Sequence, residues 1–218
     1  GATFMATDFS TKDRVLAETE TSEVQAKLKA RGRPAFYLEA SRYHILQYSP
    51  LFKYYDFGIA YKGLAGRETF TTETIEKADQ SVVSTLDGTN KFYDHYATAH
   101  FNFNHVLQLG DYNFIQNSIG VDANYGFSRS RTSESAVLGG AEQLPGTFTG
   151  ALHYKLGYGF KVSKKLMVIP TLETTLVSAE PFDNGRSTLR FFNSRYQPVI
   201  FSLRFLMLRQ QGLEDCIP

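Results

Sequence analysis

The chain has 218 residues, a formal net charge of +1 at pH 7 and a single cysteine, Cys216. The near-neutral charge argues against a nucleic-acid partner, and one cysteine excludes an intramolecular disulfide. No segment approaches the roughly 18 continuous apolar residues of a membrane-spanning helix. Residues 1–20 contain no basic segment followed by an apolar one, so we expect that a signal peptide is either absent or already removed.

The N-terminal segment, residues 1–34, differs in pattern from the rest of the chain. Residues 2–9 could form a short first strand, whereas residues 10–33 are predicted to be a polar loop with one or two short helices. Ser22 and Gln25 have the spacing of a helix capping box, and Gly32 before Pro34 is a helix stop signal. The alternative is that the whole segment folds into or beneath the remaining structure.

From residue 35 onwards, apolar and polar residues alternate over long segments, which is the period of a β-strand. An ordinary strand has about 5–6 residues, whereas a tilted strand that crosses a bilayer needs about 9–11. The observed lengths therefore favour strands that span a membrane. The predicted strands are 35–48, 54–65, 91–108, 112–130, 147–162, 166–180 and 194–208.

The predicted connections alternate between short and long. Short turns at 49–53, 109–111 and 163–165 alternate with long loops at 66–90, 131–146 and 181–193. Bacterial outer-membrane barrels sort their connections in this way, with the short turns facing the periplasm, and they have an even number of strands. Residues 2–9 would supply the eighth strand.

We therefore expect an all-β fold, an antiparallel up-and-down transmembrane β-barrel of eight strands. The barrel would comprise residues 35–208 together with the first strand, and residues 209–218 would form a C-terminal tail. Within the strand at 166–180, Pro170 cannot donate a hydrogen bond to its neighbour, so it predicts a bulge or a local break.

The two faces of the predicted strands differ in character. One parity is bulky and aromatic, which suits lipid contact, and the other is small and polar, which suits a narrow interior. The residues expected to face lipid are Tyr55, Phe57, Ile59, Val121, Tyr125, Leu152, Tyr154, Leu156, Phe201 and Leu203. The residues expected in an interior network are Lys155, Glu173, His153, His100, Asp122 and Arg204. The reverse arrangement would be a soluble, lipocalin-like barrel whose apolar face lines a ligand cavity.

One interior contact can be predicted from the register of two strands. If Val162 pairs with Leu166 across the short turn at 163–165, Lys155 lies directly opposite Glu173. Directly opposed residues have Cβ atoms about 4.5–5.5 Å apart, so we expect these two side chains to form a salt bridge. A register shift at Pro170 would separate them.

The long alternating strands, the sorted connections and the aromatic last strand, Tyr196–Phe205, resemble the small outer-membrane barrel proteins of the OmpA, OmpX and OmpW type. The resemblance covers roughly residues 35–208 and concerns architecture alone. It implies a location in a Gram-negative outer membrane, contact with lipid and lipopolysaccharide, and a signal peptide that has been removed. In those families the last strand often ends the chain, whereas here residues 206–218 follow it.

Some outer-membrane barrels are enzymes with a recognisable set of catalytic residues. Lipid A deacylase barrels use a His-x-Ser pair with a downstream Glu. This chain has His153-x-Lys155 followed by Glu173, so the serine nucleophile is missing. His100 and His105 fall on opposite strand faces and are poorly placed to share a metal. We therefore expect no enzymatic activity, no metal site and no cofactor.

The function expected from the sequence is structural or interactive. The barrel would stabilise the envelope or present its loops to a ligand or partner, such as another envelope protein. An eight-stranded barrel is just wide enough for its own side chains to fill, so general porin-like diffusion is not expected. A narrow channel for small solutes, a lipid-modifying acyl hydrolase and a soluble ligand-binding barrel are the alternatives.

Overall fold

The computed structural model describes residues 1–7, 12–18, 20–78, 81–133, 147–163, 165–180, 186–189 and 196–208. This part of the chain is all β and forms one antiparallel sheet, as the alternation predicts. It contains no helix of the length and hydropathy needed to span a membrane. The strands are β1 (Ala2–Thr7), β2 (Lys12–Glu18), β3 (Ser22–Arg33), β4 (Ala35–Ile45), β5 (Tyr54–Glu76), β6 (Val82–Gln108), β7 (Asn113–Ser133), β8 (Phe148–Lys161), β9 (Leu166–Glu180), β10 (Arg186–Leu189) and β11 (Tyr196–Met207).

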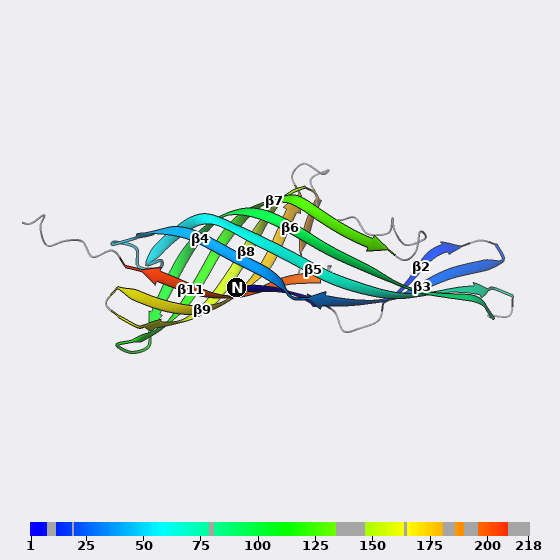
Figure 1. Cartoon of the computed structure of the whole chain (residues 1–218), viewed down its shortest axis with the longest axis horizontal. Coiled ribbons are helices and arrows are strands. Elements are labelled where there is room, and N and C mark those ends of the chain that lie inside the picture. The colour runs from blue at the N-terminus through cyan, green and yellow to red at the C-terminus, as the bar shows by residue number, and fades with distance from the viewer. Residues whose placement is uncertain are drawn as a thin grey trace, which may run out of the picture.

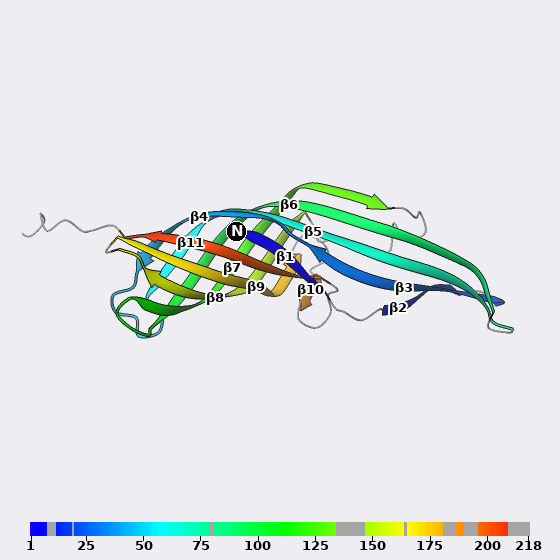
Figure 2. The same ribbon diagram turned by 60° about the horizontal axis from the view of Figure 1, so that its bottom comes forward.

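Eight of these strands close into a ring (Figures 1 and 2). The order around the ring is β4, β5, β6, β7, β8, β9, β11 and β1, and each strand is antiparallel to its neighbours. The first strand closes the ring. β1 pairs with β11 from Ala2↔Phe201 to Thr7↔Tyr196, and with β4 at Ala2 and Thr3.

The prediction of helices within residues 10–33 is wrong. Residues 22–33 form β3, which pairs with β5 without interruption from Ser22↔Glu76 to Arg33↔Ala65. The side chain of Gln25 donates a 2.9 Å hydrogen bond to Glu23, its neighbour but one in the strand. Apolar residues at every second position from Val24 to Ala30 show the strand period, which outweighs the weak capping signal.

The expected long loop at 66–90 is also wrong. β5 continues to Glu76, and β6 begins at Val82, so both strands extend far beyond the ring. Together with β2 and β3 they form a four-stranded extension, called the arm here, which projects from the ring on the right of Figures 1 and 2.

Two ion pairs connect neighbouring segments of the arm. The Lys27 and Glu73 side chains lie 2.9 Å apart across β3 and β5, and the Lys77 ammonium lies 2.7 Å from the Glu18 carboxylate. The hydrogen bond from Lys77 lowers the pKa of the exposed Glu18 carboxyl. Both pairs lie at the surface, so each contributes little to stability.

The two ends of the ring differ. The connections at 46–53, 109–112 and 162–165 lie at one end, called the turn end here. The arm and the last residues of β7 and β9, Ser133 and Glu180, lie at the other. The expected tail at 209–218, with Cys216, and the ends of two predicted strands (residues 8–9 and 194–195) lie outside the described residues.

Pro170 does not shift the register of its strand. The β8–β9 pairs Gly157↔Thr171 and Phe160↔Val168 lie on either side of it in one register, and only the ladder between them is interrupted. The register of these two strands changes only at a bulge between Leu152 and His153, away from Pro170.

A close approach between β1 and β3 generates a testable prediction. A Cβ at Gly32 would overlap the backbone carbonyl of Met5. We therefore expect Gly32→Val to push β1 away from β3 and to lower the free energy of unfolding by about 1–3 kcal/mol, as overpacking does. Urea unfolding followed by tyrosine fluorescence measures this. Arg31→Val, on the exposed face of the same strand, is the control, and an equal loss in both variants would contradict the prediction.

Candidate functional site

The interior of the ring holds a cluster of charged side chains, which we call the interior network. They occupy the inward parity of seven strands, β4 to β9 and β11, and contact one another through the interior of the ring. The network consists of Glu39, Asp56, Lys62, His100, Asp122, His153, Lys155, Glu173 and Arg204.

Two lysines lie at the centre of the network, and the position of Lys155 confirms the predicted register of β8 and β9. Lys155 pairs with Glu173 across β8 and β9, and its ammonium lies 3.0 Å from the carboxylate. It also lies 3.4 Å from Glu39 on the other side of the interior. Lys62 lies 2.8 Å from Asp122 and 3.8 Å from Glu173. Both lysines therefore link strands that are not neighbours in the sheet.

Arg204 links Glu39 to the fourth carboxylate, Asp56. Its Nη2 lies 3.3 Å from Glu39 Oε1 and 3.3 Å from Asp56 Oδ2. Asp56 also accepts hydrogen bonds of 2.7 Å from the side-chain amides of Asn102 and Asn104. A buried carboxylate is stable only when its oxygens are paired and hydrogen-bonded, and Asp56 meets that requirement fully.

His153 is completely buried, and both of its ring nitrogens face acceptors. Its Nε2 lies 2.6 Å from Asn102 Oδ1, and its Nδ1 lies 3.2 Å from Asp122 Oδ1. Because the amide nitrogen of Asn102 donates to Asp56, its oxygen must accept, so His153 Nε2 carries a proton.

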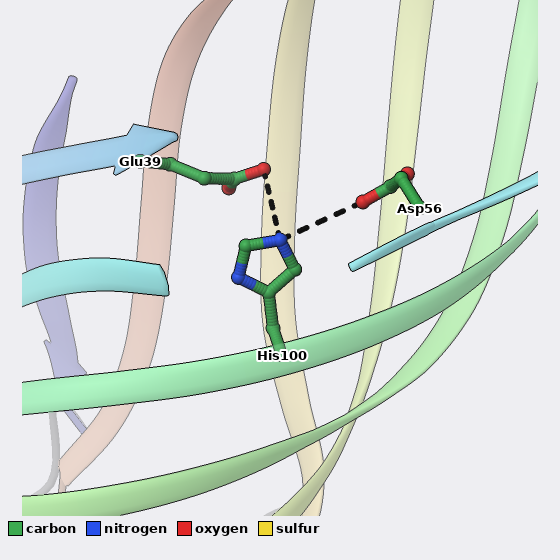
Figure 3. A group of neighbouring side chains, drawn as sticks. All are labelled: Glu39, Asp56 and His100. Atoms are coloured by element: carbon green, nitrogen blue, oxygen red, sulfur yellow. Dashed lines mark ion pairs between the residues drawn. The ribbon is translucent and has the colours of Figure 1, made fainter. Parts of the chain in front are cut away.

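His100 lies between the carboxylates of Glu39 and Asp56, with its Nε2 turned towards both (Figure 3). The distances are 3.5 and 3.6 Å, longer than hydrogen bonds, and neither ring nitrogen has a hydrogen-bond partner among the described residues. One imidazole and two carboxylates within 4.8 Å of one another could hold a divalent cation.

Cations of the protein itself already occupy these carboxylates. Arg204 contacts both Glu39 and Asp56, and Lys155 contacts Glu39. The second possible metal-binding group, Asp122, His153 and Glu173, is similarly held by Lys62 and Lys155. A metal ion in either group would have to displace an ammonium or guanidinium group, because buried like charges repel strongly.

The two buried histidines do not meet a nucleophile in the described part of the chain. His153 contacts an amide and a carboxylate, and His100 faces two carboxylates. Lys155, at the position of the missing serine, pairs with acids instead. A hydroxyl nucleophile paired with a histidine base is therefore not assembled at either position.

The structure brings together all six residues expected in the interior network. The ten residues expected to face lipid are all on the outer side and none is buried; Tyr55 and Leu152 are half-buried and the other eight are exposed. Sequence reasoning missed Glu39, Asp56 and Lys62 as members of the network. Each lies on the polar parity of its strand, so the same alternation could have identified them.

No protein-family model matches the chain, and neither do the curated proteins or the solved structures with which it was compared.

The contact between His153 and Asn102 depends on a glycine. A Cβ at Gly120 would overlap Asn102 Oδ1 and His153 Nε2. We expect Gly120→Ala to break this hydrogen bond and to reduce the free energy of unfolding by about 1–3 kcal/mol. Gly150→Ala is the matched control, because its Cβ would meet nothing closer than 3.9 Å. Denaturant unfolding of both variants is the measurement, and an unchanged midpoint for Gly120→Ala would refute the packing described here.

Removing one charge from the centre of the network should be costly. Lys155→Met leaves Glu173 and Glu39 with fewer partners, and we expect a loss of about 3–5 kcal/mol in unfolding free energy. The double variant Lys155→Met/Glu173→Leu should recover part of this loss, which a double-mutant cycle measures. Lys27→Met, at the exposed pair with Glu73, should cost at most about 1 kcal/mol. Equal losses at Lys155 and Lys27 would show that the interior pair has no special role.

Proposed function

We propose that this chain is an outer-membrane β-barrel of eight strands that is filled by its own side chains and presents its arm to a partner in the envelope. The observation that carries the proposal is the polarity of the ring. Large apolar side chains cover its outside, including Ile59 at 70% and Val121 at 53% exposure, while charged and amide side chains fill the inside. A lipocalin-like barrel would have the reverse arrangement, whereas a barrel in lipid needs this one.

Aromatic side chains on the outer face support a membrane position. Near the turn end, Tyr55 stacks on Phe101, with ring centroids 5.5 Å apart. Towards the arm, Tyr61 packs near Phe36 and Phe127. Tyr55 and Tyr61 are six residues apart on β5, which corresponds to about 20 Å along a strand. Two aromatic levels around an apolar band are typical of outer-membrane barrels.

The filled interior supports a structural role rather than a channel. The ion pairs of Lys62 and Lys155 cross the ring, and a second layer of Tyr54, Gln116 and Asn104 is hydrogen-bonded beneath them. An ion passing through would have to break several of these contacts. We therefore place the interaction with other molecules at the surface, with membrane lipid and lipopolysaccharide around the ring.

The arm is the part suited to binding a partner beyond the lipid. Its two outer edges, β2 and residues 82–89 of β6, have no further strand beside them among the described residues. Val82, Val83 and Leu86 on the second edge are exposed. An uncovered strand edge with apolar side chains can add a strand from another protein.

Arginine substitutions at two exposed valines test the membrane position of the ring. Val121 is 53% exposed on the proposed lipid belt, and Val83 is 64% exposed on the arm. In lipid, an arginine at the first position should cost about 2–4 kcal/mol, so Val121→Arg should reduce the folded fraction after insertion into vesicles. Val83→Arg should leave it unchanged. The folded form is measured by heat-modifiable migration on a detergent gel, and a chain that stays monomeric without detergent and shows no such shift would disprove the proposal.

A further inference from the structure

The interior of the ring changes character at the turn end. There most of the inward side chains are apolar, and they line a cavity of about 360 Å³, within the range of ligand pockets. The lining includes Tyr43 and Ile45 from β4, Val106 from β6, Met167 from β9, and Leu206 and Leu208 at the end of β11. These residues lie on the parity that is polar elsewhere in the ring, so the cavity is not a by-product of the outer apolar belt.

The cavity is closed on its inner side. Tyr54, Phe114 and Ile169 are buried and form a floor between the cavity and the polar interior. The Tyr54 hydroxyl donates a 2.9 Å hydrogen bond to the side chain of Gln116, and the ring of Phe114 covers Gly159. A ligand could therefore enter only from the turn end and could not pass through the ring.

Few polar groups in the cavity are available to a ligand. The Tyr43 hydroxyl donates to the carbonyl of Met207, and the Gln108 amide donates to the carbonyl of Gly110. Two lysines, Lys53 and Lys161, also line the cavity. Lys161 donates one hydrogen bond to the carbonyl of Asp111, and neither ammonium pairs with a carboxylate in the described part of the chain.

We propose that the turn-end cavity binds a single-chain amphiphile with an anionic headgroup, of the fatty-acid class. The hydrocarbon chain would lie against the apolar lining, and Lys53 and Lys161 would hold the carboxylate. A cationic amphiphile would be repelled by the two lysines, and a sugar would find too few hydrogen-bond partners. The proposal does not depend on the membrane position of the ring, because the cavity lies inside it.

The test uses the full chain held in amphipol, so that no detergent micelle competes, with 11-(dansylamino)undecanoic acid as the fluorescent probe. We expect saturable binding that dodecanoate displaces and dodecyltrimethylammonium does not. Lys53→Glu/Lys161→Glu should weaken probe binding about tenfold or more, because both lysine charges are reversed. Leu206→Trp should abolish it by filling the cavity.

Two controls separate the cavity from the outer surface. Leu203→Trp, on the exposed face of the same strand, should bind the probe as the parent chain does, and circular dichroism verifies that every variant is folded. Binding that does not saturate, or that dodecyltrimethylammonium displaces equally well, overturns the proposal. So does an equal loss in Leu203→Trp and Leu206→Trp, because it would place the probe on the outer belt.

Discussion

Charges buried within a closed ring must be neutralised by other side chains, because water cannot reach them to do so. In this chain that constraint links strands around the ring: Lys62 and Lys155 each contact acids on two different strands, and Arg204 does the same. A shift of one residue in any strand would turn its charge to the outer face. The network therefore determines the register of the ring as well as filling it.

The sequence predicts the ring well, because its strands face different environments on their two sides. Alternation of bulky and small residues indicates which side chains point inwards, and the tight turn at 163–165 is short enough to predict that Lys155 opposes Glu173. The cross-ring contacts of Glu39 and Asp56 could not be predicted in this way. They depend on the curvature of the ring, which brings β4 and β5 close to β8 and β11, and no local pattern encodes that distance.

The arm was missed for a different physical reason. Residues 66–76, the outer part of β5, are rich in Thr and Glu and contain only two large apolar residues, Phe70 and Ile75. The two sides of such a strand meet similar surroundings, so their alternation is weak and a loop is predicted instead. Continuous pairing with β3 and β6 stabilises these residues as strands, and that pairing is a property of the tertiary structure.

The position of β1 has a consequence for how the chain folds. The ring closes where Ala2 meets Phe201, so its last seam joins residues from opposite ends of the chain. Every other seam of the ring except β4–β1 joins strands that follow one another along the ring part of the chain, so its contacts have a shorter sequence separation. Closure must wait for β11, and contacts of such long sequence separation form slowly. Until this seam forms, β1 and β11 each present an open edge, so the unclosed ring is the species most exposed to pairing with a second copy.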